Sequence, residues 1–252
     1  MHKIIALWAV PRSTSTAFEW MVRQRGDLEC LHEPYGEAWY QGEEPLWPRL
    51  TEDSLRTPGL MESVHADLQR RAGRGPVFIK DFPHYVDHMW DAEMTGMFVH
   101  SFLIRDPAKT ITSIYDKWPD FHEAEVGFPE QRALFDRIAD IKGAPPPVID
   151  SDDLLQDPHG VVWKWCAAVG LDFIEDALSW EPGARDEVSW WDGGSFHQNL
   201  RDSDGLKPQP RSGYIDIEEA PDRVREVYER MRPHYAHLHR HRLGAGDAAR
   251  QL

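Results

Sequence analysis

The sequence predicts an α/β fold in which a parallel sheet is covered by helices on both faces, so that the domain has three layers. Short apolar runs at residues 3–10, 76–79 and 97–104 have the length and composition of buried strands. Segments with helical spacing lie between these runs, and such alternation is typical of a parallel sheet. The chain has 252 residues, so we expect a single domain over residues 1–252.

The first strand and the first helix are predicted within residues 3–25. The apolar run at 3–10 is interrupted by Pro11, and residues 17–25 show helical spacing that stops at Gly26. A second short strand is expected at residues 28–31. It leads to Glu33, which we place at a strand end or in a loop because the proline that follows favours an extended backbone there.

Residues 36–60 contain many prolines, acidic residues and tryptophans, with little periodicity. They are predicted to form a long loop over the active face, because such loops in compact domains usually carry function. Residues 61–72 have moderate helical character and end at Gly73, so a helix is expected there.

The next two strands end in cationic side chains. Residues 76–79 are followed by Lys80, and residues 97–104 are followed by Arg105. The helix after the latter strand is expected to use Asp106 as its N-cap and Pro107 in its first turn.

The rest of the chain completes the alternation of strands and helices. We expect a strand at residues 148–149 and irregular structure at 180–220. The segments 36–60 and 180–220 are the two predicted active-site loops. Pro221 opens a long last helix that Pro233 is expected to kink or split. Helices are predicted at residues 129–142 and 159–169.

The junction between the first strand and the first helix has the composition of an anion site. A helix N-terminus offers unpaired N–H groups and the positive end of the helix dipole. An arginine and four consecutive hydroxyl side chains at that point favour binding of phosphate or sulfate over a simple N-cap by Ser13 or Ser15. The segment lacks the Gly-Lys-Ser/Thr of a Walker A loop. The residues are Arg12, Ser13, Thr14, Ser15 and Thr16.

Residues 8–20 resemble the 5′-phosphosulfate loop of the PAPS-dependent sulfotransferases, in the bacterial branch that writes it Pro-Arg-Ser-x-Ser-Thr. The glycine common in that loop elsewhere in the superfamily is Thr14 here. Arg105, Pro107, Ser113 and Tyr115 resemble the 3′-phosphate motif of the same family. Residues 148–173 are similar to the structural segment that follows these motifs. The resemblance covers much of residues 1–175 and implies a P-loop NTPase-like sulfotransferase fold.

The resemblance also implies the co-substrate. PAPS would be the donor and PAP the product, with no metal. Residues 12–16 would hold the 5′-phosphosulfate, and Arg105 and Ser113 would hold the 3′-phosphate; the guanidinium can fork onto a phosphate and the hydroxyl can donate one more hydrogen bond. Arg211 lies in the basic, glycine-containing segment 207–213, which would close over the nucleotide.

Sulfuryl transfer depends on in-line positioning and on cations that meet the growing negative charge, as phosphoryl transfer does. Arg12 and Lys80 are the predicted cations. Glu33 is the leading base for the acceptor proton, because glycan-modifying and bacterial members of the family use a glutamate near that point. His84 is the rival base, although Phe82 stands where cytosolic members have their histidine. Either side chain works near neutral pH if its surroundings tune its pKa; alternatively, Glu33 only holds backbone N–H groups.

Composition excludes several kinds of partner. The net charge of −15 argues against nucleic acid and against an anionic membrane surface. Two distant cysteines, Cys30 and Cys166, fit a reducing cytoplasm, and no apolar run is long enough to span a bilayer. The histidines at positions 234–241 lack neighbouring acidic residues, so a solvated helix tail is favoured over a metal site.

The predicted function is therefore transfer of a sulfuryl group to a hydroxyl, or less readily an amine, of a small-molecule acceptor. A homodimer is compatible with the sequence. Two alternatives stay open at this point: a P-loop-type kinase or NTPase that uses ATP and Mg²⁺, and a non-catalytic protein that kept the nucleotide pocket. The missing Gly-Lys-Ser/Thr disfavours the first.

Overall fold

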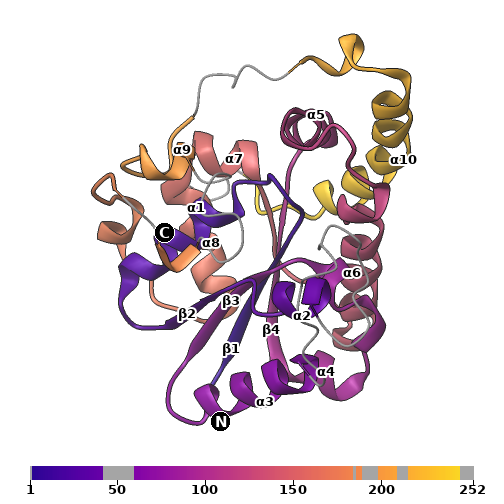
Figure 1. The fold of residues 1–252 in the computed structure, drawn as a ribbon. Helices are drawn as coiled ribbons and strands as arrows, with labels where there is room; N and C mark the ends of the chain where they lie inside the picture. Colours follow the sequence, from indigo (N-terminus) through magenta and orange to yellow (C-terminus); the bar gives the residue numbers. More distant parts are fainter. Residues whose placement is uncertain (1, 42–59, 184–185, 189–197, 209–214, 245–252) are drawn as a thin grey trace.

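The computed structural model describes residues 2–41, 60–183, 186–188, 198–208 and 215–244. Its strands form one parallel sheet, as the sequence predicts, and their order in the sheet is β2-β3-β1-β4-β5 (Figure 1). The strands are β1 (Ile4–Ala9), β2 (Glu29–His32), β3 (Val77–Asp81), β4 (Phe98–Ile104) and β5 (Val148–Asp150).

Strand β1 is the centre of the sheet. All six of its residues are buried, and it pairs with β3 on one side and with β4 on the other. A strand that is covered on both faces needs apolar side chains at every position, which explains the unbroken apolar run in the sequence.

Helices cover both faces of the sheet. Helices α1, α7 and α8 lie on one side, and α5, α6 and α10 lie on the other (Figure 1). Ile111 and Ile114 of α5 lie in one buried apolar cluster with Val224 and Val227 of α10. The bounds are α1 (Ser15–Arg25), α2 (Gly36–Gln41), α3 (Leu60–Ala72), α4 (Ala92–Met97), α5 (Pro107–Lys117), α6 (Phe128–Lys142), α7 (Ser151–Gln156), α8 (Pro158–Val169), α9 (Gln198–Arg201) and α10 (Asp222–His239).

The prediction of a long loop over residues 36–60 is wrong at the start of that range, where the chain forms the short helix α2. Ala38 and Trp39 of this helix are buried in the core, so tertiary packing stabilises a helix that is too short to form alone. Residues 42–59 lie outside the described part of the chain. The predicted irregular segment at 180–220 contains the short helix α9, and only parts of that segment are described.

The last helix differs from the prediction in two ways. It runs through Pro233 without a break, so the proline does not split it. His237 does have an acidic neighbour, because its Nε2 lies 2.7 Å from Asp136 of α6. That contact comes from a helix distant in sequence, which local spacing does not reveal. Within the described residues, no group of three or more metal-ligating side chains is found. No helix in those ranges has the length and apolar content to cross a bilayer.

His100 on β4 is a buried histidine in a fixed tautomer. The indole N–H of Trp8 donates to its Nδ1 at 2.9 Å, and its Nε2 lies 2.9 Å from the carbonyl oxygen of Thr95. Only a neutral ring with its hydrogen on Nε2 satisfies both contacts. Burial lowers the pKa of His100 to about 4, and it lowers the pKa of His84 to about 3.

The unfolded chain therefore binds protons on these two histidines before the folded protein does. We expect the free energy of unfolding to fall as the pH drops from 6.5 to 4, by up to about 1.4 kcal/mol per pH unit for each histidine. His100→Asn, whose amide oxygen can accept the Trp8 hydrogen bond, should make this dependence shallower. Urea unfolding at several pH values measures it. His88→Asn, at an exposed position, is the control and should leave the slope unchanged.

Candidate active site

The candidate site lies at the carboxyl edge of the sheet, where β1, β3 and β4 end. The connection after β1 leads to β2 on one side of the sheet, and the connection after β4 leads to β5 on the other side. The two connections therefore diverge between β1 and β4, and ligands of open α/β sheets bind at such a switch point. The segments at residues 10–14 and 105–106 leave the sheet on its two sides.

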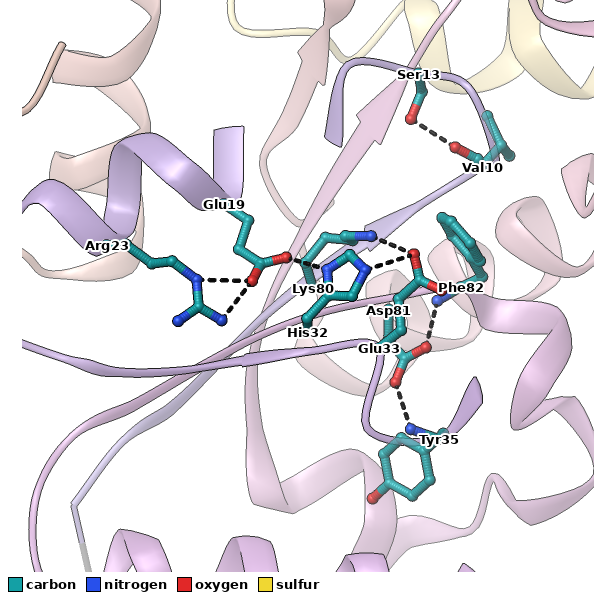
Figure 2. Close-up of polar contacts among 10 residues, drawn as sticks. All are labelled: Val10, Ser13, Glu19, Arg23, His32, Glu33, Tyr35, Lys80, Asp81 and Phe82. Carbon is teal, nitrogen blue, oxygen red and sulfur yellow. Dashed lines mark hydrogen bonds and ion pairs between the residues drawn. The ribbon is translucent and has the colours of Figure 1, made fainter. Parts of the chain in front are cut away.

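The loop after β1 leaves the amino end of α1 open. The Ser13 hydroxyl donates to the carbonyl oxygen of Val10 at 2.6 Å, and Thr14 at the N-cap makes no side-chain bond to the helix (Figure 2). The first backbone bond of the helix runs from Phe18 N–H to Thr14 O. The N–H groups of Ser15, Thr16 and the next residue precede that bond, so the simple N-cap interpretation does not describe this loop.

Thr14 takes the backbone conformation that glycine adopts most easily. Its φ is 72°, in the left-handed region, which costs a non-glycine residue about 1–2 kcal/mol. Its hydroxyl lies 2.7 Å from that of Ser151 at the start of α7, and this hydrogen bond helps to hold the residue in place. The loop therefore keeps the shape that a glycine would give it, although the sequence has threonine.

The two motifs that resemble phosphate-binding segments are in direct contact. Arg105 donates from Nη1 to the carbonyl oxygen of Arg12 at 2.6 Å, and Arg12 donates from Nε to the hydroxyl of Ser113 at 3.0 Å. These residues are 93 and 101 positions apart in the sequence. The structure thus brings the candidate 5′ and 3′ phosphate ligands to one place.

Glu33 and Lys80 form a buried ion pair beside this loop (Figure 2). The exposed fraction of the side chain is 0% for Lys80 and 7% for Glu33. Glu33 also donates its backbone N–H to the Lys80 carbonyl oxygen at 2.8 Å, and its φ is 44°. Two side chains 47 positions apart are thereby fixed against each other at the ends of β2 and β3.

Sequence reasoning missed two ionisable residues behind this pair, Glu19 and His32. His32 Nε2 lies 3.6 Å from Glu33 Oε1, and His32 Nδ1 lies 2.7 Å from Glu19 Oε2. Glu19 also pairs with Arg23 at 2.8 Å. Burial acts to raise the pKa of Glu19, but the facing His32, Lys80 and Arg23 hold it at about 2. A signal was present: Glu19 falls among Ser15, Phe18 and Val22 on the face of α1 that the spacing predicts to be buried.

Asp81 fixes the two turns that follow β2 and β3. Its carboxylate accepts the N–H of Tyr35 and the N–H of Phe82, both at 2.9 Å. Burial raises the pKa of Asp81 well above its ordinary value. Asp81 therefore fixes the backbone just after Glu33 and just after Lys80.

His84 is packed as a core residue. It is 5% exposed, its ring stacks on Phe82 with centroids 5.6 Å apart, and its Nδ1 lies against Gly127. With a pKa lowered to about 3 by burial, it is a weak base. These observations weigh against the rival assignment. Arg211 lies outside the described residues; in the same segment Lys207 pairs with Asp204 at 2.7 Å.

The family model described as "Sulfotransferase domain" matches residues 2–217. The chain belongs to this family. The match covers the open loop, the Glu33–Lys80 pair and the Arg105 motif, and it favours sulfotransferase over the kinase or NTPase alternative.

Solved structures show that the sulfotransferase domain has the expected P-loop NTPase-like fold. The sulfotransferase domain of the Synechococcus PCC 7002 olefin synthase superposes with a TM-score of 0.53 at 19% identity, over 91% of this chain and 94% of that one. Mouse sulfotransferase SULT7A1, solved in complex with PAP, gives a TM-score of 0.50 at 10% identity, over 91% of this chain and 82% of that one.

A curated relative is larger than the sulfotransferase domain described here. The Arabidopsis thaliana branched-chain-amino-acid aminotransferase-like protein 2 is 26% identical over 244 residues, which is 93% of this chain and 42% of that protein. The chain thus spans about two fifths of the relative's length.

The buried Glu33–Lys80 ion pair is predicted to contribute to the stability of the fold. Lys80→Met keeps the length of the side chain and removes the ammonium group, which leaves a buried carboxylate with less compensating charge. We expect the free energy of unfolding at pH 7 to fall by about 3–5 kcal/mol. Adding Glu33→Gln should restore most of this loss, because a neutral amide needs no cation. Urea unfolding tests both; a double variant no more stable than Lys80→Met alone would contradict the prediction.

Proposed function

We propose that the protein transfers the sulfuryl group of PAPS to a hydroxyl, or less readily an amine, of a small-molecule acceptor and releases PAP. The observation that supports this most directly is the contact between the Arg12 loop and Arg105 at the switch point of the sheet. One nucleotide with phosphates at both ends fits a site whose two anion ligands adjoin each other.

The donor would be held by two sets of groups. The 5′-phosphosulfate lies against the N–H groups at the start of α1 and the side chains of residues 12–16, where the helix dipole favours negative charge. Arg105 and Ser113 receive the 3′-phosphate. Arg211 is proposed as a further ligand from the segment at 207–213.

In the reaction, the acceptor oxygen attacks the sulfur in line with the bond to the 5′-phosphate. A new S–O bond forms, the S–O bond to the phosphate breaks, and its electron pair stays on PAP. Lys80 and Arg12 would stabilise the negative charge that grows on the leaving oxygen and on the sulfuryl oxygens. The acceptor proton passes to a base on the protein.

Glu33 is the proposed base. It lies at the end of β2 beside Lys80, so the base and the cation for the leaving oxygen are adjacent. The buried, neutral His84 is less suited to accept a proton, since its pKa is about 3. The acceptor, the cytoplasmic location and a homodimer remain predictions from the sequence.

The assignment of Arg105 predicts a loss of nucleotide affinity. Arg105→Ala removes the fork to the phosphate and the bond to the Arg12 carbonyl, so we expect PAP to bind well over tenfold more weakly. Isothermal titration calorimetry measures the dissociation constant, and circular dichroism checks the fold. Arg230→Ala, which breaks an exposed pair with Glu123, should leave PAP affinity unchanged. Unchanged affinity in Arg105→Ala would remove the assignment.

The assignment of Glu33 predicts a separation of binding from turnover. Glu33→Gln keeps the shape of the side chain and removes its basicity, so transfer should fall by at least about a hundredfold while PAP still binds. Radiolabelled PAPS with a panel of phenols, aliphatic alcohols and amines gives the rate. If turnover persists, the proton goes to His84 or to solvent instead.

A further inference from the structure

A row of alternating charges runs from the buried side of α1 to the candidate base (Figure 2). Arg23 pairs with Glu19, Glu19 with His32, His32 with Glu33, and Glu33 with Lys80. The exposed fraction of the side chain is 0% for Glu19 and 4% for His32. Glu19, His32, Glu33 and Lys80 thus lie together away from solvent at the edge of the sheet, and Arg23 ends the row at 18% exposure.

Such a row is an expensive way to hold a fold together. Taking a charged group out of water costs several kcal/mol, and well-packed apolar side chains of similar volume are often at least as stable. Glu19 lies on α1 among the buried apolar residues Phe18, Met21 and Val22, where an apolar side chain would pack directly. Its charge therefore needs another explanation, and its partner His32 supplies one.

Each ring nitrogen of His32 faces a carboxylate. Nδ1 lies 2.7 Å from Glu19 Oε2, and Nε2 lies 3.6 Å from Glu33 Oε1. Two contacts on opposite sides fix both the position and the rotation of an imidazole ring. The Nδ1 contact is within hydrogen-bond distance, and the Nε2 contact at 3.6 Å is an ion-pair distance at which a ring with hydrogen on both nitrogens attracts the carboxylate.

The backbone is bent to allow this arrangement. Neighbouring residues of a strand point to opposite faces of a sheet, so the side chains of His32 and Glu33 would normally diverge. The φ of 44° at Glu33 breaks that alternation directly after β2. A non-glycine residue in the left-handed region is strained, and here the strain brings the imidazole and the carboxylate together.

We propose that His32, oriented by Glu19, is a positioning residue that fixes the Glu33 carboxylate and favours its charged form. This inference rests on the proposed function, in which Glu33 is the base and Lys80 serves the leaving oxygen. When the Lys80 ammonium contacts the donor, His32 keeps a cation beside Glu33. Glu33 then stays ionised and directed until the acceptor proton arrives.

The pH dependence of turnover tests this role. A positive neighbour lowers the pKa of a carboxylate, so its removal raises that pKa and moves the acidic limb of the rate profile to higher pH. The other charged or titratable groups around Glu33 are unchanged in a His32 variant. They are Glu19 and Arg23 from α1, Lys80 and Asp81 from β3, and His84 from the turn that follows.

The experiment compares wild type with His32→Gln and Glu19→Gln, using radiolabelled PAPS and the best acceptor of the panel above. We expect kcat to fall at least about tenfold in both variants, with the PAP dissociation constant within about twofold of wild type. In His32→Gln the acidic limb should also move up by at least ~0.5 pH unit. Glu19→Gln keeps the test valid if His32→Gln does not fold.

A matched control separates positioning from a general loss of stability. Glu125 is a buried carboxylate outside the row of charges: it is 3% exposed and accepts the His122 N–H at 2.8 Å. Glu125→Gln should lower the melting temperature without changing kcat or the pH profile.

Unchanged kcat and an unchanged limb in both site variants would overturn the positioning role while the proposed function stands. The same holds if their kcat falls only in proportion to the folded fraction. If the wild type binds PAP but transfers no sulfate to any acceptor, the proposed function fails, and this role fails with it.

Discussion

The hydrogen bond from Arg105 to the carbonyl oxygen of Arg12 joins the two halves of the candidate site. It exists because β1 and β4 are neighbouring parallel strands whose carboxyl ends meet at one edge. Without that pairing, the loop after β1 and the arginine after β4 would belong to separate surfaces. The sheet therefore supplies the geometry, and the loops supply the charge.

The second requirement of the site is a set of buried charges that balance one another. Lys80, Glu33, His32 and Glu19 lie in an order in which each carboxylate faces a basic side chain. A low-dielectric setting strengthens every electrostatic contact with a donor anion, provided that each buried charge is compensated before the donor arrives. The same contacts tie α1, β2 and β3 to one another at the edge where the chemistry is proposed.

The sequence predicted the strands, their alternation with helices and the position of the loop between β1 and α1, because buried parallel strands leave unbroken apolar runs and each run ended in a recognisable polar segment. It did not predict α2, because tertiary burial of Trp39 rather than local periodicity stabilises that helix. It missed the pairing of Glu19 with His32 because the spacing of α1 places Glu19 on the buried face but does not identify its partner at the end of β2. Thr14 shows the opposite case: the backbone of the motif is kept although the residue type differs.

Gln131 on α6 links the carboxyl ends of β1 and β4. Its side-chain amide donates to the carbonyl oxygens of Trp8 and Leu103, both at 3.0 Å, and the residue is 1% exposed. A buried carbonyl oxygen left without a partner costs free energy, and one neutral amide satisfies both oxygens here. Gln131 therefore clamps the two neighbouring strands together just before the loop at residue 10 and the turn at residue 105 begin.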